Sequence, residues 1–349
     1  MNKKKIAIIF GGYSTEYAVS LQSAYAVLSK LDIEKYDVIP IGISKSGDWF
    51  RYYGAYENIQ SDTWLEDTIN LNPVVISQNR SIGGFIEVTP NGNRVTKLNV
   101  VFPILHGKNG EDGTVQGLIE LAGIPLVGCN TLSFALCMDK DKAHLLVQAV
   151  GITAPRAVVV KKFENESALL SLTEELKYPL FVKPVRAGSS FGISKIFKEE
   201  ELISAVLLAF EHDNEVIIEE NIDGFEVGCA ILGNSDLLVG KVDEIEITDG
   251  FFDYTEKYTL KNSKIHMPAR IDELTEKKVQ ETACVIYKTL GCSGFARVDM
   301  FLTPNNEIVF NEVNTIPGFT SHSRYPNMMR SIGLSFNEIL DRLIGLCEV

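Results

Sequence analysis

The stretch from Arg297 to Arg324 reads RVDMFLTPNNEIVFNEVNTIPGFTSHSR, and two short apolar runs in it flank a polar turn. Asp299, Glu312 and Asn314 carry hard oxygen ligands of the kind that Mg2+ accepts when it is shared with nucleotide phosphates. Alternation along a strand places Phe310, Glu312 and Asn314 on one side, so that both ligands face one cavity. The spacing predicts a magnesium site for ATP-dependent chemistry. The alternative is that these are ordinary polar residues at strand ends.

Length and composition describe a globular protein of more than one domain. The chain has 349 residues, which favours two or three domains of about 100 to 150 residues each. Its hydrophobic content is 45% and its mean hydropathy is +0.06. The net charge of -13 argues against general binding to DNA, RNA or an anionic membrane. A polyanion must therefore be bound by a few placed lysines and arginines.

The cysteines and the N-terminus indicate a cytoplasmic location. The six cysteines form neither a C-x-x-C pair nor a zinc-ligand spacing, so we expect reduced and mostly buried thiols. The apolar run Ile6–Phe10 follows three lysines but is shorter than the core of a secretory signal. No run approaches the roughly 20 apolar residues that span a bilayer.

The N-terminal third reads as an α/β domain that ends near residue 128. Residues 5–12 predict a buried strand ending in a glycine turn, and residues 20–31 have helical spacing, as in the first βα unit of a doubly wound sheet. Further strands are expected at 36–43 and 99–106, while 61–93 is poorly patterned. Beyond this domain, we expect helices at about 166–176, 199–211, 275–290 and 337–346.

Glycine-rich turns after three predicted strands carry candidate ligands. Lys183 begins KPVRAGSSFG, a loop whose backbone N–H groups can cradle phosphate although it is not a Walker A motif; the alternative is a plain turn. Glu16 follows GGYST and is interpreted as a ligand for an amine, or else as a carboxylate at a helix N-terminus. His106 precedes GKNGEDG, where a catalytic and a structural histidine are both open.

Other charged residues are ambiguous when they are read one at a time. Glu219 and Glu226 suit contacts to adenine and ribose, or are solvated charges at strand ends. Without a partner, the simplest interpretation of Lys140, Lys142 and Lys257 is surface lysines.

Together these residues resemble the D-alanine:D-alanine ligase family of the ATP-grasp superfamily, almost end to end. The motifs that carry the resemblance are GGYSTE at 11–16, LHGxxGEDGT at 105–114, MDK at 138–140, FVKPxRxGSS at 181–190, DYxxKY at 253–258, RxD at 297–299 and NExNTxPGxTSHS at 311–323. Tyr17 stands where many relatives have histidine.

The resemblance implies an ATP-grasp fold of three α/β domains with ATP between the second and the third. Residues 1–128 would form a Rossmann-like domain, 129–223 the central domain, and 224–349 the C-terminal domain with a lid at 248–268. The implied cofactors are ATP and two Mg2+ ions, with Mn2+ as a substitute. The implied chemistry is transfer of the γ-phosphate to a D-alanine carboxylate, followed by attack of a second amine and release of phosphate.

The resemblance also implies roles for single residues. In the nucleotide and metal sites these are Lys140, Lys183, Lys257 and Ser190 at the phosphates, Glu219 and the segment Glu220 to Ile222 at adenine, Glu226 at ribose, and Asp299, Glu312 and Asn314 at the metals. In the reaction they are Glu16 at the first ammonium, His106 at the first carboxylate, Arg297 at the oxyanion, and Ser189 bonded to Tyr258 near the second amino acid and the lid.

The pocket for the second amino acid departs from the common pattern at two positions. Arg324 stands after Ser323, where most members have leucine or methionine, and Phe252 replaces a usual tyrosine. Both changes resemble the D-alanine:D-serine ligases of vancomycin resistance, of the VanG and VanC type. The substrate residues implied are Phe252, Gly318, Ser323 and Arg324.

The sequence therefore predicts an ATP-dependent D-alanine:D-serine ligase of cell-wall precursor synthesis. The alternatives are an ordinary D-alanine:D-alanine ligase and a catalytically silent ATP-grasp binding protein. D-lactate is disfavoured because the pair Lys257 and Tyr258 is retained. The expected partners are small-molecule substrates and a second copy of the chain, with no nucleic acid and no membrane.

Overall fold

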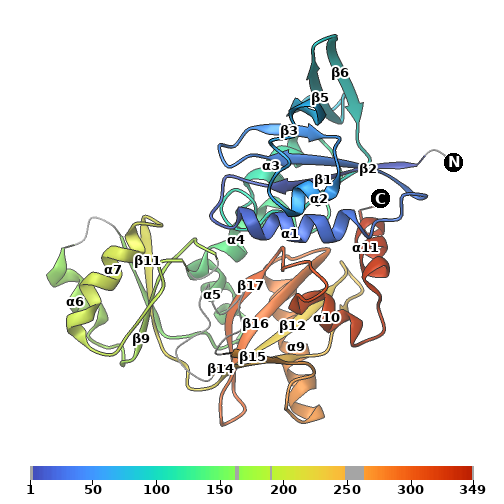
Figure 1. Ribbon diagram of the computed structural model, residues 1–349. Coiled ribbons are helices and arrows are strands. Elements are labelled where there is room, and N and C mark those ends of the chain that lie inside the picture. The colour runs from blue at the N-terminus through green and yellow to red at the C-terminus, as the bar shows by residue number, and fades with distance from the viewer. Residues whose placement is uncertain (1–2, 162–164, 189–190, 248–262, 348–349) are drawn as a thin grey trace.

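The computed structural model describes residues 3–161, 165–188, 191–247 and 263–347, which build three β-sheets (Figure 1). The N-terminal sheet, at the top of Figure 1, has seven strands in the order β6-β5-β4-β3-β2-β1-β7. The second sheet has the order β10-β9-β11-β8. The third has the order β15-β14-β12-β16-β17, with β13 paired to β12.

The parallel centre of the N-terminal sheet confirms the expected βα unit. Strand β1 pairs in parallel with β2 on one side and β7 on the other. Five consecutive apolar residues, Ile6 to Phe10, are fully buried in β1 because helices and loops cover both faces. The elements of this part are β1 (Lys4–Gly11), α1 (Tyr17–Leu28), β2 (Tyr36–Ile43), β3 (Trp49–Tyr52), α2 (Tyr56–Gln60), a 3-10 turn (Thr68–Asn70), β4 (Leu71–Ile76), β5 (Gly84–Thr89), β6 (Gly92–Lys97), β7 (Val100–Pro103) and α3 (Thr114–Leu121).

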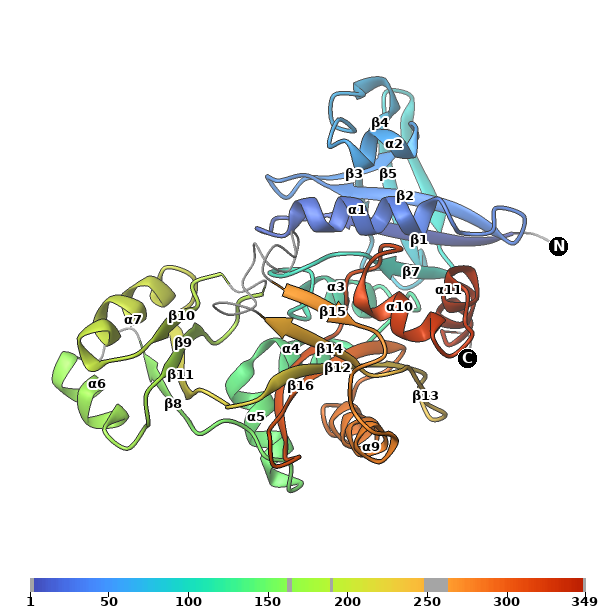
Figure 2. The same cartoon turned by 60° about the horizontal axis from the view of Figure 1, so that its bottom comes forward.

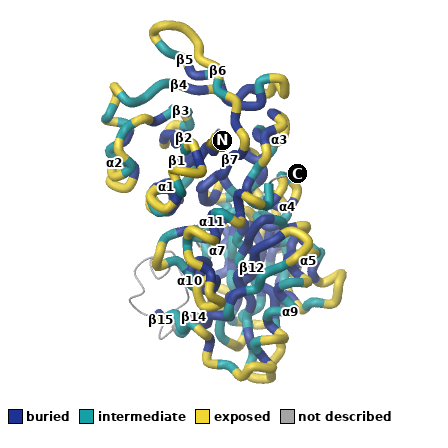
Figure 3. The backbone as a smooth tube through the Cα atoms, turned by 90° about the vertical axis from the view of Figure 1, so that its right-hand side faces the viewer, coloured by how far each residue is buried: buried dark blue, intermediate teal, exposed yellow. Residues whose placement is uncertain are grey.

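Part of this sheet corrects the expectation of a doubly wound arrangement. Strands β3 to β6 are antiparallel and end in the β5–β6 hairpin, which projects from the molecule in Figures 1 and 3. Strands β4 and β5 come from the stretch 61–93 that looked poorly patterned, and β6 begins at its end. Strand β6 is exposed at nearly every residue, so it lacks the alternation of apolar and polar residues by which a half-buried strand is identified.

The central unit is a small antiparallel sheet with helices α6 and α7 on it (Figure 2). Its apolar core joins Val160, Leu180 and Val182 of the strands to Leu169 and Val206 of the helices. The elements are β8 (Ala157–Lys161), α6 (Glu166–Thr173), β9 (Leu180–Pro184), β10 (Ser194–Ile196), a 3-10 turn (Glu199–Glu201), α7 (Leu202–Phe210) and β11 (Glu215–Glu220).

The C-terminal unit is built on the third sheet. Its elements are β12 (Phe225–Leu232), β13 (Leu238–Val239), β14 (Asp243–Ile247), β15 (Ser263–His266), α9 (Glu273–Thr289), β16 (Phe295–Leu302), β17 (Ile308–Asn314), α10 (Arg324–Arg330) and α11 (Phe336–Gly345). Helices α4 (Thr131–Met138) and α5 (Lys140–Ala149) contact β17 of this sheet, although they belong to the expected central domain of 129–223. The domain boundaries stay predictions.

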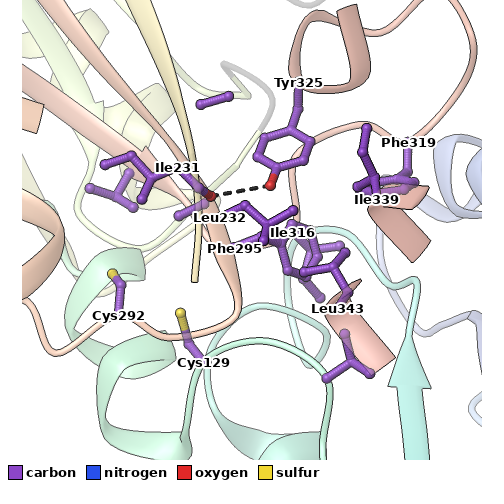
Figure 4. Close-up of a cluster of buried hydrophobic side chains, with 14 of the residues drawn as sticks. Cys129, Ile231, Leu232, Cys292, Phe295, Ile316, Phe319, Tyr325, Ile339 and Leu343 are labelled. Carbon is purple, nitrogen blue, oxygen red and sulfur yellow. Dashed lines mark hydrogen bonds between the residues drawn. The ribbon is translucent and has the colours of Figure 1, made fainter. Parts of the chain in front are cut away.

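One continuous core joins the N-terminal and C-terminal parts. Phe102 of β7 makes edge contacts with Phe295 of β16 and with Phe319. Figure 4 shows Phe295, Ile316, Phe319 and Tyr325 packed together, with the Tyr325 hydroxyl donating to the carbonyl of Ile231 at 3.1 Å. The loop between β17 and α10 is therefore anchored in the interior, as is the first turn of α10.

Candidate active site

The three predicted metal ligands meet on two neighbouring strands. Asp299 of β16 is paired with Glu312 of β17, and a bulge follows at Met300. The Asn314 Nδ2 donates to Asp299 Oδ2 at 2.9 Å and lies 3.5 Å from Glu312 Oε1. Two carboxylates and one amide within hydrogen-bond reach of one another suit Mg2+, which takes a few protein oxygens and completes its shell with phosphates and water. The residues present therefore fit the implied metal.

Arg297 lies beside this group and faces Asp299. Its Nε donates to Asp299 Oδ1 at 2.8 Å and its Nη2 to Oδ2 at 2.6 Å, a bidentate pair. Burial lowers the pKa of Arg297, but the charge and hydrogen bonds of Asp299, together with the charge of Asp243, more than offset it, and the pKa lies above its ordinary value. The guanidinium is thus a permanent positive charge held in the site.

Lys183 and Glu219 form a buried pair on the central sheet. Lys183 Nζ donates to Glu219 Oε2 at 2.7 Å across strands β9 and β11. Burial raises the pKa of Glu219, but Lys183, His144 and Lys140 together more than offset this, and the pKa lies below its ordinary value. The other oxygen, Glu219 Oε1, is buried and has no hydrogen-bond partner among the described residues. An orphaned acceptor of this kind fits an amino group on a ligand such as adenine.

Lys140 begins helix α5 and reaches the glycine-rich loop. Its Nζ donates to the carbonyl of Ala187 at 2.8 Å, and its backbone N–H donates to Val185. On the same helix His144 packs against the ring of Phe310 and contacts the Asn311 carbonyl through Nε2. Lys140, Lys183 and the glycine-rich loop after Lys183 therefore lie together, as a phosphate site requires.

Glu16 lies between two glycines from different parts of the chain. A Cβ on Gly107 or on Gly188 would collide with the Glu16 carboxylate, so each glycine allows a close backbone approach. Glu16 is the N-cap residue of α1 but makes no side-chain capping bond, which favours the ligand interpretation over the capping one. The carboxylate instead faces the loop after β7 and the loop after β9.

His106 is a buried neutral imidazole. Its Nε2 lies 3.2 Å from Ser23 Oγ, and the ring also bonds the backbone of Ile316. Burial lowers the pKa of His106 to about 4, against a small opposing effect of that backbone bond. At neutral pH the imidazole therefore carries no positive charge.

Arg324 is held by carboxylates in the interior of the protein. Its Nε and Nη2 donate to Asp243 Oδ2 and Oδ1, each at 2.7 Å, and its Nη1 donates to Glu226 Oε1 at 3.0 Å. Asp299 Oδ1 lies 3.4 Å from Nη2. The Arg324 side chain therefore makes buried ion pairs and links the start of α10 to strands β12, β14 and β16.

The loop before α10 contains Gly318 and Ser323, which were predicted to lie at the second substrate. Ser323 Oγ accepts from the Thr320 N–H at 3.0 Å and lies 2.8 Å from Thr320 Oγ1. A Cβ on Gly318 would lie 3.0 Å from the same Oγ, so the loop is tightly folded there. Two expected adenine residues are placed as well: Glu220 accepts from the Lys177 N–H at 2.9 Å, and Ile222 is partly buried after β11.

Five of the predicted site residues lie outside the described part of the chain. In addition, the structure brings three residues to this region for which the sequence predicted no role. Those outside are Ser189, Ser190, Phe252, Lys257 and Tyr258, together with most of the expected lid. The three missed residues are Asp243, Glu111 and Ser23. Asp243 has no motif around it, and only its contact with Arg324 shows it, whereas Glu111 stood in a quoted motif without a role. Across the described ranges, no helix has the length and apolarity required to cross a bilayer.

Comparison with known proteins concerns the chain as a whole. Two family models match, the D-ala D-ala ligase N-terminus over residues 5–129 and the D-ala D-ala ligase C-terminus over residues 146–345. The fold is similar to the crystal structure of the VanG D-Ala:D-Ser ligase from Enterococcus faecalis, with a TM-score of 0.93 and 64% identity over 99% of this chain and 100% of that one.

Curated relatives include a vancomycin resistance protein and a D-alanine:D-alanine ligase. The vancomycin C-type resistance protein VanC1 of Enterococcus gallinarum is 43% identical over 99% of this chain and 98% of its own length. A D-alanine:D-alanine ligase of Caldicellulosiruptor bescii is 42% identical over 99% of this chain and 95% of its own length.

Proposed function

Because the chain belongs to the D-alanine:D-alanine ligase family, we propose that it joins D-alanine to D-serine through a D-alanyl phosphate. The family is one of ATP-dependent enzymes that form a peptide bond between small amino acids and use ATP and Mg2+. The proposal concerns the identity of the second amino acid. The dipeptide product of the reaction would form the altered terminus of a peptidoglycan precursor in vancomycin resistance.

In the proposed reaction, the first D-alanine carboxylate attacks the γ-phosphorus of ATP and ADP leaves. The amine of the second amino acid then attacks the acyl carbon, and phosphate leaves after loss of a proton. Two Mg2+ ions, or Mn2+ in their place, supply charge that neutralises the transferring phosphoryl group. Asp299, Glu312 and Asn314 hold them, while Arg297 stabilises the oxyanion. Glu16 binds the first ammonium and neutral His106 orients the first carboxylate.

One observation carries the D-serine assignment, the guanidinium of Arg324 directly after Ser323. Three of its five N–H groups make the bonds to Asp243 and Glu226, so donors are left for a substrate hydroxyl. The methyl group of D-alanine cannot accept such a bond. A hydrogen bond to a charged donor is worth roughly 1.5 to 3 kcal/mol, which sets a preference of about tenfold to a hundredfold.

A competition assay tests the assignment. The enzyme is given ATP, Mg2+, D-alanine and D-serine together, and the two dipeptides are resolved by mass. Arg324→Leu is expected to shift the kcat/KM ratio toward D-alanine by about tenfold to a hundredfold. Because both products come from one preparation, the ratio does not depend on how much of the variant is folded. Arg330→Leu, on the exposed end of the same helix, is the matched control. An unchanged ratio in Arg324→Leu would remove Arg324 as the selector.

The second candidate is a D-alanine:D-alanine ligase, and the ion pairs of Arg324 favour it. A guanidinium bound to both oxygens of Asp243 has a structural role that needs no substrate hydroxyl. A wild-type enzyme that makes D-alanyl-D-alanine in preference to D-alanyl-D-serine would establish this alternative.

We further propose a cytoplasmic homodimer, in line with the need for ATP and with the expectation from the family. Light scattering of the purified chain measures the mass in solution, and a monomer at working concentration would contradict the dimer.

A further inference from the structure

Glu111 connects two loops that are far apart in the sequence. Its Oε2 accepts from the Gly107 N–H at 2.9 Å, and its Oε1 accepts from the Ile316 N–H at 3.1 Å. Gly107 lies four residues before Glu111 in the sequence, and Ile316 lies 205 residues after it. A single carboxylate thus ties the loop after β7 to the loop after β17.

The first of these loops belongs to the subsite of the first amino acid. Gly107 follows His106 directly, and its Cα lies against the carboxylate of Glu16. Ser14 Oγ donates to the His106 carbonyl at 2.8 Å and accepts from the Glu16 N–H at 3.1 Å, so these residues form one unit. A shift of Gly107 would therefore move the groups expected at the first D-alanine.

The second loop belongs to the subsite of the second amino acid. Ile316 is followed by Pro317, which has no N–H, then by Gly318 and, after a short turn, by Ser323 and Arg324. Ile316 and Phe319 point into the shared core (Figure 4). Ser23 supports the same connection from α1, because its Oγ accepts from the Phe319 N–H at 3.3 Å and lies 3.2 Å from His106 Nε2.

We propose that Glu111 is a positioning residue that holds the two amino-acid subsites in register, an inference that rests on the proposed function. Glu111 acts on the two subsites through Gly107 and Ile316, whose backbone N–H groups it holds. Burial and the charge of Glu16 raise the pKa of Glu111 to about 8, while the two backbone N–H bonds favour its ionised form. A carboxyl group is required because each of its oxygens accepts one N–H, whereas an amide has one accepting oxygen and one donating nitrogen. Glutamine would place an NH2 group against one of the two backbone N–H groups and break that connection.

The test compares Glu111→Gln with Asp112→Asn, its neighbour. The Asp112 carboxylate also accepts two backbone N–H bonds, from Asn109 at 2.8 Å and Thr114 at 3.0 Å, but both lie within its own loop. In Glu111→Gln, kcat/KM for the amino acids is expected to fall by about tenfold to a hundredfold through higher KM values. The KM for ATP and the D-serine to D-alanine ratio should stay within about twofold of wild type. Asp112→Asn should lower the melting temperature and leave the amino-acid KM values within about twofold of wild type.

The outcomes separate the two proposals. Amino-acid KM values of Glu111→Gln that match those of Asp112→Asn would overturn the positioning role. Equal rises in the KM for ATP and for the amino acids would overturn it too, because they indicate a general structural defect. If Glu111→Gln does not fold, Glu111→Asp, which keeps the carboxyl group but is one methylene shorter, is expected to show the same rise in amino-acid KM. A wild-type chain that releases no phosphate with D-alanine overturns the proposed function, and this inference with it.

Discussion

Asp299 receives hydrogen bonds from Arg297 and Asn314 and lies within ion-pair distance of Arg324, while it is almost completely buried. A charge removed from water in this way is stabilised only by its partners, so each substitution around it has a large effect. The same partners hold the carboxylate in place before a substrate binds. Charge stabilisation of this preorganised kind is the main catalytic contribution in phosphoryl transfer.

Replacing Glu312 tests the metal site directly. Glu312→Gln is expected to abolish turnover while the fold stays intact, because the loss of one carboxylate ligand weakens the metal sites and the charge neutralisation they give. Phosphate release measures the activity and circular dichroism measures the fold. Glu307→Gln, on the exposed turn before β17, is the control. Near-normal activity of Glu312→Gln with an unchanged Mg2+ requirement would show that the metal site lies elsewhere.

Arg324 also has a structural role that its substitution should expose. Asp243 is fully buried, so Arg324→Leu leaves its charge without a counter-ion and should lower the free energy of unfolding by about 3 to 5 kcal/mol. Adding Asp243→Asn removes that charge and is expected to restore part of the loss. Urea unfolding of the single and double variants measures both values. A double variant less stable than Arg324→Leu would contradict this account of the pair.

At the scale of elements, helix α11 shows how local and distant contacts combine. Ser335 and Glu338 form a capping box at its start, and Ile339, Leu340, Leu343 and Ile344 face the core. Asp341, on the other side, accepts from Lys35 Nζ at 2.6 Å and from the Tyr36 hydroxyl at 2.9 Å, which fixes the helix to the N-terminal sheet. The helix therefore connects the C-terminal part of the chain to the N-terminal sheet.

The cap of α11 should contribute to stability and not to catalysis. Ser335→Ala removes the acceptor for the Glu338 N–H and is expected to lower the free energy of unfolding by about 1 kcal/mol. Amino-acid and ATP KM values should not change. Ser331→Ala is the control, because that hydroxyl only contacts the Asn327 carbonyl of its own helix. Equal stability losses in the two variants would count against the capping box.

At the scale of the whole molecule, His106 makes stability depend on pH. Burial lowers its pKa to about 4, whereas the unfolded value is 6.5. Between these values the unfolded chain binds a proton that the folded chain does not, so stability is lost as the pH falls from 6.5 toward 4. The loss attributable to this histidine is about 3 kcal/mol over the full interval.

A comparison of variants isolates this effect from the other titrating groups. His106→Gln is expected to lose less stability than wild type between pH 6.5 and pH 4.5, as measured by urea unfolding at each pH. His212→Gln, at an exposed position, should follow the wild-type curve. Parallel curves for wild type and His106→Gln would mean that His106 is not buried as a neutral group.

Several elements of this protein were predictable because their signals are local. The apolar run Ile6 to Phe10, the helix spacing of α9 and the order of the family motifs indicated the α/β class and the ATP-grasp resemblance. Asp299, Glu312 and Asn314 were also predicted to come together, and the paired strands β16 and β17 place them side by side. Strand alternation and neighbouring chain segments are enough for such a site.

Only the tertiary structure decided which distant groups meet. The antiparallel half of the N-terminal sheet was missed because the exposed strand β6 has no periodic pattern. Asp243 and Arg324 are 81 residues apart, and Glu111 and Ile316 are 205 apart, so no spacing rule connects them. The sequence assigned roles to many residues of the family motifs, but it assigned none to Asp243 or Glu111. The physical reason is that a buried charge pairs with whichever opposite charge the tertiary fold brings next to it, and the spacing of residues in the sequence does not show which one that is.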